Sequence, residues 1–221
     1  PALEITGVQA APAQGAQVPG YYRTKVGNFQ VTALLDGGLD MTDDLFTSVG
    51  AKPEEVSAAK ERNFLDTSKP FPGVLNGFLI NTGTKLLLID TGAGTMLGEN
   101  AGRLERNLAA AGVTPDQIDE IILTHAHPDH AGGLLDGNGM RVFKKASVRI
   151  SADDLDFWYS EDAKKRLPQK AQMFDLAKKL LDPYKSAGQI DTFRDGQSIK
   201  NGVTAIALPG HTPGHSGIRV S

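Results

Sequence analysis

Residues 121–133 read Ile-Ile-Leu-Thr-His-Ala-His-Pro-Asp-His-Ala-Gly-Gly and contain three of the five histidines of the chain. The apolar residues at the start predict a buried strand and the glycines at the end predict a turn, so the polar side chains between them should project into a cleft. His125 and His127 are two residues apart on extended backbone and can bind one ion. Asp129 and His130, beyond the bend, can serve a second ion nearby.

The other two histidines lie in a second segment, Leu208-Pro209-Gly210-His211-Thr212-Pro213-Gly214-His215. This segment also follows a predicted strand, so one of its histidines can complete the first site. For His215, a structural role and the orientation of a neighbouring ligand are alternatives to metal binding. Imidazole nitrogens and carboxylate oxygens without sulfur suit zinc, with manganese, iron or cobalt as alternatives. We therefore expect two divalent metal ions.

The composition narrows the class of protein. The chain has 221 residues, of which 40% are hydrophobic and 22% are charged, and its net charge is -3. These values are typical of a soluble globular domain and give no indication of a nucleic-acid partner. No apolar run approaches the roughly 18 residues that cross a bilayer, so no membrane partner is expected. The absence of cysteine excludes disulfides, thiolate ligands and cysteine nucleophiles. The first residue, Pro1, indicates a processed or engineered start.

Strands and helices alternate along most of the chain. Residues 1–20 are rich in alanine, proline, glycine and glutamine and predict a flexible N-terminal arm, so the folded domain is expected over 21–221. The pattern then predicts a strand at 29–35 closed by a turn at 36–38, a helix at 53–64, a hairpin of 77–81 with 85–90, a helix that ends at 112, strands at 120–123 and 147–151, helices from 152 and over 167–181, and strands at 189–193, 203–208 and 217–220. This order favours an α/β sandwich in which helices cover the sheets.

Two other features are predicted near the end of the strand at 85–90. Asp90 either orients a metal-binding imidazole or belongs to a turn with the two residues that follow it. The glycine-rich residues 92–98 do not have the spacing of a dinucleotide-binding fingerprint, so they predict a tight loop near the site. The basic run at 164–166 is interpreted as a solvated helix face.

The segment from His125 to His130 matches the His-x-His-x-Asp-His signature of the metallo-β-lactamase superfamily, which the chain therefore resembles. Residues 88–92, Leu-Ile-Asp-Thr-Gly, and 209–212, Pro-Gly-His-Thr, are similar to recurrent segments of that superfamily and occur in the same order. The resemblance implies an αβ/βα sandwich with a dinuclear metal site at one edge. It further implies that His125, His127 and His211 hold one ion, and that Asp129 and His130 form part of the other site.

Other segments resemble the methyl parathion hydrolase branch, which contains exported organophosphorus hydrolases. These are residues 19–23, Pro-Gly-Tyr-Tyr-Arg, residues 29–37 and Asp156-Phe157-Trp158. The resemblance implies a periplasmic or secreted location and a leaving-group pocket lined by Trp158. Phe174, Met173 and Leu97 are further candidates for the pocket wall. Packing in the core is the alternative for Trp158.

The chain also departs from the family pattern. Family members supply a bridging aspartate after a further strand and a last histidine near the C-terminus, whereas no histidine follows His215 here. We expect a sandwich whose second half is truncated, with exposed apolar surface and an open sheet edge. Donation of the missing groups by another polypeptide and weak binding of the second ion are the alternatives.

The resemblance implies hydrolysis by a hydroxide that bridges the two ions, with Asp129 as catalytic proton acceptor. Organophosphorus triesters are the first substrate hypothesis, with promiscuous cleavage of esters or lactones. An acyl-homoserine lactonase is the alternative, and β-lactamase or thioester hydrolase activity ranks lower. A hypothesis of a different class is an inactive metal-binding fragment. The expected partners are a small-molecule substrate and a second copy of the chain in a homodimer.

Overall fold

The computed structural model describes residue 15 and residues 18–221, and most of the expected flexible arm at 1–20 lies outside these residues. The larger of two sheets has seven strands whose order in space is their order in the chain. They are β1 (Tyr21–Val26), β2 (Phe29–Met41), β3 (Phe71–Asn81), β4 (Leu86–Ile89), β5 (Glu120–Ile122), β6 (Ser147–Ser151) and β7 (Ile190–Phe193). Strands β1 to β4 pair antiparallel, and β4 to β7 pair parallel. All carboxyl ends of the parallel strands therefore meet at one edge.

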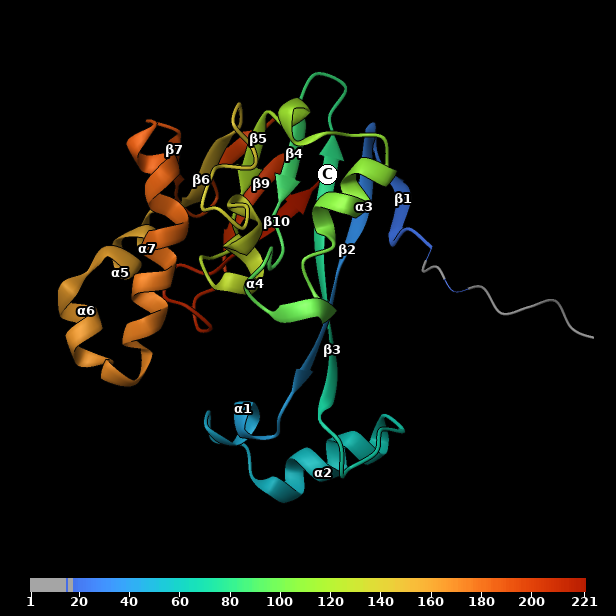
Figure 1. Cartoon of the computed structure of the whole chain (residues 1–221), viewed down its shortest axis with the longest axis vertical. Coiled ribbons are helices and arrows are strands. Elements are labelled where there is room, and N and C mark those ends of the chain that lie inside the picture. Colours follow the sequence, from blue (N-terminus) through green and yellow to red (C-terminus); the bar gives the residue numbers. More distant parts are fainter. Residues whose placement is uncertain (1–14, 16–17) are drawn as a thin grey trace, which may run out of the picture.

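Helices supply the first layer, beside the larger sheet (Figure 1). The main ones are α3 (Leu104–Ala110), α5 (Ala152–Tyr159), α6 (Glu161–Arg166) and α7 (Ala171–Ser186). A hydrophobic core joins them to the sheet, with Leu88, Ile121 and Val148 from the strands and Leu108 and Leu180 from the helices. Burial of such side chains is the main favourable term in folding.

A smaller antiparallel sheet covers the opposite face of the larger one. It contains β8 (Ser198–Lys200), β9 (Val203–Ala207) and β10 (Ser216–Val220), in the order β10-β9-β8. Ile80, Ile89 and Ile122 of the larger sheet pack against Val203 and Ala205 in a second core. The layers are thus helix, sheet, sheet, which confirms the expected α/β class with helices over a sheet. In the described part of the chain no helix follows β7, so the outermost helical layer of an αβ/βα sandwich remains an expectation.

An open apolar pocket of about 300 Å³ lies between the two sheets next to β10. Its walls include Val31 and Phe78 from the larger sheet and Ile218 and Val220 from β10. Strand β10 has a single neighbour, β9, among the described strands. An open edge beside an apolar pocket is what a truncated second half of the sandwich would leave, and the truncation itself stays a prediction.

The predicted turn at residues 36–38 is wrong, because β2 continues through it with a bulge between Leu35 and Gly37. The cause is the buried side chain of Asp36, whose oxygens accept the backbone N–H groups of Ala93, Gly102 and Leu104. A β-carbon at Gly37 would lie 2.1 Å from the carbonyl oxygen of Asn100, so only glycine fits beside this loop. Long-range hydrogen bonds thus convert a local turn signal into a bulge.

Strands β2 and β3 run beyond the body of the sheet and carry two helices at their far end, as Figure 1 shows. These are α1 (Asp44–Thr47) and α2 (Pro53–Arg62). Phe46 and Phe71 make an edge-to-face contact there, with ring centroids 6.2 Å apart. The ammonium group of Lys60 is buried and binds the carboxylate of Asp43 and the carbonyl oxygen of Lys69. The extension is thus held by one aromatic contact and a buried ammonium group, beside an open apolar pocket of about 320 Å³.

Most of the remaining predicted elements are confirmed. The hairpin of β3 and β4, the helix that ends before Gly112 and the strand at Ser147–Ser151 occur as expected. The helix expected from residue 167 instead begins as α7 at Ala171, because Pro168 opens a separate short turn. The pattern did not predict β1, β8 or α1, and the helix expected from residue 152 is divided into α5 and α6, the second of which carries the basic run at 164–166. Among the described residues, no helix is both long enough and apolar enough to cross a bilayer.

Candidate metal centre

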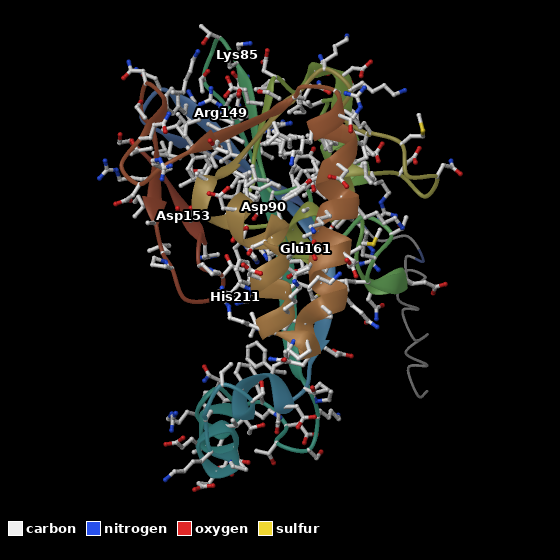
Figure 2. The ribbon with its side chains drawn as sticks, turned by 90° about the vertical axis from the view of Figure 1, so that its left-hand side faces the viewer. Lys85, Asp90, Arg149, Asp153, Glu161 and His211 are labelled. Atoms are coloured by element: carbon white, nitrogen blue, oxygen red, sulfur yellow. The ribbon has the colours of Figure 1, made fainter. Side chains whose placement is uncertain are left out.

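The segments that follow three strands supply the histidines and the carboxylate beside them. The segment after β5 carries His125 and His127 and leads into the short helix α4 (Pro128–Ala131), and the segment after β9 carries His211. Strand β4 ends next to Asp90. In Figure 2, His211 lies at the end of the body that faces α1 and α2, and Asp90 lies deeper inside.

The ring of His125 is the centre of the cluster. Its centroid is 4.7 Å from that of His127, 4.1 Å from His130, 4.8 Å from His211 and 5.0 Å from His215. The rings of His125, His127 and His211 are almost mutually perpendicular, with interplanar angles of 81°, 82° and 85°. They therefore surround a common point and do not stack on one another.

Three ring nitrogens converge on that point. His127 Nδ1 lies 3.0 Å from His125 Nε2 and 2.9 Å from His211 Nε2. One ligand atom from each of the three residues lies within 4.8 Å of the other two. Three nitrogens bound to one tetrahedral zinc ion at 2.0–2.1 Å would be separated by about 3.3 Å. The donor type and its spacing thus fit a single zinc-like ion, as the sequence predicted.

Asp129, His130 and Asp90 form a second group beside the three histidines. His130 Nδ1 donates to Asp90 Oδ2 at 2.7 Å, and His130 Nε2 lies 3.2 Å from Asp129 Oδ2. Asp90 therefore orients an imidazole, that of His130, as one of its two expected roles required. Asp129 and His130 do lie together, and their binding of a second ion stays a prediction.

The hydroxyl of Thr124 links the two groups. It donates to Asp90 Oδ2 at 2.8 Å and therefore accepts from His125 Nδ1, which is 3.0 Å away. This places the proton of His125 on Nδ1 and leaves Nε2 free to bind an ion. The sequence analysis did not identify Thr124, although its place directly before the first histidine was a signal that could have done so.

Asp90 has an unusual backbone conformation. Its φ angle is +57°, one of two positive values found for non-glycine residues in the described chain. The conformation is held by three hydrogen bonds: Asp90 N–H donates to Ile122 O at 3.0 Å, and Thr124 donates to the carboxylate through N–H and hydroxyl, both at 2.8 Å. Strain of this kind persists where surrounding contacts fix it, which is typical of functional sites.

The two groups differ in charge. Burial and the neighbouring histidines lower the pKa of His125 far below its usual range and lower the pKa of His127 to about 4. The pKa of His211 is lowered by the same causes. Burial also acts to lower the pKa of His130, but its bonds to Asp129 and Asp90 outweigh burial and raise that pKa to about 10. Three rings are therefore neutral at pH 7, whereas His130 is protonated.

His215 has a different environment from His211. Its Nδ1 lies 3.1 Å from the backbone carbonyl oxygen of Leu208, so the ring N–H donates there. His215 is not among the three residues whose ligand atoms converge. Its geometry agrees with the structural alternative, in which the ring braces the segment that carries His211.

The expected pocket residues fall into two groups. Trp158 and Phe174 are both fully buried and pack in the main core, with ring centroids 5.1 Å apart. Core packing therefore describes both positions, which corrects the expectation that they line an open wall. Trp158 still contacts the site, since its ring centroid is 5.3 Å from that of His127. Met173 is exposed and Leu97 is half-buried, and their place in a pocket stays a prediction.

Comparisons with known proteins agree on the family. The family model for the metallo-beta-lactamase superfamily matches residues 71–221. The probable metallo-hydrolase YqjP of Bacillus subtilis is 31% identical over 147 residues, which are 60% of this chain and 45% of the relative. This chain thus spans less than half the length of that curated relative.

Two solved structures have a similar fold. One, the hydrolase AbOPH in the beta lactamase superfamily, gives a TM-score of 0.85 at 34% identity and covers 93% of this chain and 71% of its own. The other, AidC, is a dizinc quorum-quenching lactonase in complex with a product, N-hexanoyl-L-homoserine. It gives a TM-score of 0.82 at 27% identity and covers 91% of this chain and 70% of its own.

Proposed function

This chain belongs to the metallo-beta-lactamase superfamily, and on that premise we propose that it is a metal-dependent hydrolase of small-molecule esters. The observation that carries the proposal is the convergence of ring nitrogens from His125, His127 and His211 within 4.8 Å of one another. Three neutral imidazoles directed at one point are a donor set for a zinc-like ion and have no comparable structural use.

The residues divide between two proposed ions. His125, His127 and His211 would hold the first, and Asp129 and His130 would contribute to the second. When bound, such ions lower the pKa of water so that hydroxide is available near neutral pH, and they polarise the phosphoryl or carbonyl oxygen of a substrate.

Asp129 is the proposed catalytic residue of the chain itself. Burial acts to raise its pKa, but the hydrogen bond and the charge of His130, with smaller contributions from the Asp129 backbone and from His127, together outweigh burial, so the pKa of Asp129 is lowered. The carboxylate is thus ionised at neutral pH and can accept a proton from the attacking water. Its Oδ2 lies 3.2 Å from His130 Nε2, which fixes the direction in which the carboxylate points.

Organophosphorus triesters are the first proposed substrate class. Support comes from the segments at 19–23, 29–37 and 156–158, which resemble the methyl parathion hydrolase branch. An aryl phosphotriester has a phenolate leaving group that needs little protonation, so the chain requires no additional general acid for it.

An acyl-homoserine lactone is the second proposed substrate class. A specific observation favours it, since the dizinc lactonase AidC shares the fold at a TM-score of 0.82 and 27% identity. Both classes need an activated water and a polarised oxygen, so the metal centre alone does not discriminate between them.

The test is a substrate panel on protein of verified mass whose metal content has been measured by elemental analysis. We expect turnover of a nitrophenyl phosphotriester above that of N-hexanoyl-homoserine lactone, and loss of both activities in His127→Ala. Lys25→Ala, an exposed change on β1, is the control and should keep full activity. Equal rates for the native chain and His127→Ala would exclude the proposed hydrolase.

The same panel addresses the proposal of a different class, an inactive metal-binding fragment. That proposal is favoured by one bound metal ion without turnover of any substrate, and it is excluded by turnover in the absence of a longer species. A homodimer and a periplasmic or secreted location are also proposed. Sedimentation of the purified chain and fractionation of the source cells test them.

A further inference from the structure

Asp154, in the first turn of α5, is a fully buried carboxylate next to the histidine cluster. Its Oδ2 accepts the backbone N–H of Ala126 at 2.9 Å and the indole N–H of Trp158 at 3.0 Å. Ala126 stands between His125 and His127. The bond to its N–H therefore fixes the backbone that carries two of the three converging rings.

The other side of Asp154 contacts the segment that carries the third ring. A β-carbon built on Gly214 would lie 2.1 Å from the backbone nitrogen of Asp154 and 2.6 Å from its Cβ, so residue 214 must be glycine for the segment to approach α5 this closely. Thr212, which directly follows His211, is also buried. One residue of α5 thus touches both segments that supply the metal-binding histidines.

The polar atoms at this contact are incompletely paired. Among the buried side-chain atoms of the described chain, Asp154 Oδ1 and Thr212 Oγ1 both lack a well-aligned hydrogen bond. Burial raises the pKa of Asp154, although Thr212 and the N–H of Gly214 lie near enough to oppose part of that rise. A buried carboxylate with an unpaired oxygen is costly, so a position that had no role in the assembly of the site would not favour one.

We propose that Asp154 is a positioning residue that holds His211 in register with His125 and His127. The carboxylate accepts the N–H of Ala126 and so fixes the backbone of residues 125–127. The close packing of residues 212–214 against Asp154 sets the distance between the two segments. Trp158 completes the support, because the same carboxylate orients its indole against the ring of His127. This inference rests on the proposed metal site at the three histidines and assigns to Asp154 a role in its assembly.

The test measures Co²⁺ affinity by competition with a chromophoric chelator, in an Asp129→Ala background that restricts binding to the three histidines. Asp154→Asn keeps the size of the side chain and removes its charge and one acceptor. We expect a 10- to 100-fold rise in Kd, the range found when groups that orient metal ligands are changed. Asp36→Asn is the matched control, since Asp36 is equally buried and accepts three backbone N–H groups away from the histidines.

Asp36→Asn should lower the melting temperature and change the Kd for Co²⁺ less than twofold. A rise in Kd equal to that of Asp154→Asn would mean that loss of stability alone weakens the site, and it would overturn the inference. Thr212→Val, which replaces the hydroxyl with a methyl group of similar size, tests the contact while keeping the volume of the side chain. We expect it to raise the Kd several-fold, and an unchanged Kd for both Thr212→Val and Asp154→Asn would overturn the inference.

A double-mutant cycle with His211→Ala identifies the path of the effect. If Asp154 acts partly through His211, the loss in the double variant is at least threefold smaller than the product of the single losses. Additive losses would show that Asp154 acts on the 125–127 segment alone and would overturn the proposal. Absence of Co²⁺ binding by the native chain would overturn the proposed function as well, whereas native binding with an unchanged Asp154→Asn overturns only this inference.

Discussion

The two groups of side chains in the histidine cluster differ in their charge and in the hydrogen-bond partners of their ring nitrogens. His125, His127 and His211 are neutral, and Nδ1 of His127 lies 2.9–3.0 Å from the Nε2 atoms of the other two rings. Asp129 and Asp90 instead neutralise a protonated His130. The first group lacks a cation, whereas the second already contains one, the imidazolium. The first group can therefore bind an ion directly. In the second group, an ion has to replace the proton of His130.

The largest expected effect comes from removing a ligand of the neutral group. His127→Ala deletes the nitrogen that lies next to both other ligand atoms, so we expect roughly a thousandfold loss of affinity for the first ion. Titration with Zn²⁺ against a competing chelator measures it. If His127→Ala kept near-native affinity for Zn²⁺, the three neutral histidines would not be the site of the first ion.

A smaller effect is expected from the charged group. Asp90→Asn removes one negative charge beside His130 and weakens the hydrogen bond that orients its ring. We expect a 10- to 100-fold loss of affinity for the second ion with little change for the first. Elemental analysis at graded free Zn²⁺ resolves the two steps. Equal losses in both steps would indicate that the two groups act as one.

The affinities for the two ions should also depend differently on pH. Between pH 6 and pH 8 the first group is already neutral, since the pKa of His127 is lowered to about 4. The pKa of His130 is raised to about 10 in the metal-free chain, so an ion must displace its proton. The affinity for the second ion should therefore rise by about tenfold per pH unit, while the first is almost constant. Calorimetry in buffers of different ionisation enthalpy counts the protons, and a second step that releases none would contradict the assignment.

Protonation of His130 also links pH to the stability of the metal-free chain. Because its pKa is raised on folding, its contribution is fully present below the unfolded value near 6.5 and is lost as the pH rises towards about 10. We expect the melting temperature of the metal-free chain to fall between pH 7 and pH 10. The fall should be smaller in His130→Gln, which has no such proton to lose.

The smallest expected effect is at the link between the two groups. Thr124→Val removes the hydroxyl that donates to Asp90 and accepts from His125, so the proton of His125 is no longer directed to Nδ1. We expect a loss of about tenfold or less in affinity for each ion. Thr24→Val, a change on the edge strand β1, is the control. A loss confined to one ion would show that Thr124 serves a single group.

Local sequence predicted those parts of the site that lie close together in the chain. The segment from His125 to His130 follows a buried strand, and its spacing alone indicated two groups of ligands. Asp154 was not predicted to be part of the site, because its partners Ala126 and Gly214 are remote in sequence. Trp158 shows a second limit, since helical spacing does not reveal whether an aromatic ring faces a core or a pocket.

The fold was predicted to a similar extent. Alternating apolar residues identified most strands, and the signature segment indicated how the layers are arranged. The bulge at Asp36 could not be predicted, because it depends on N–H groups that lie 57 to 68 residues further along the chain. Short edge strands such as β8 carry too few residues for a period to be recognised.

The order of strands in the larger sheet has a consequence for biosynthesis. Each strand from β2 to β7 pairs with the strand made immediately before it. A chain that emerges from the ribosome can therefore extend this sheet one strand at a time, without waiting for a distant partner. The segment with His125, His127 and His130 follows the fifth strand, whereas His211 is translated after all seven strands. Capture of an ion by the three histidines therefore requires that all seven strands of the larger sheet have already been translated.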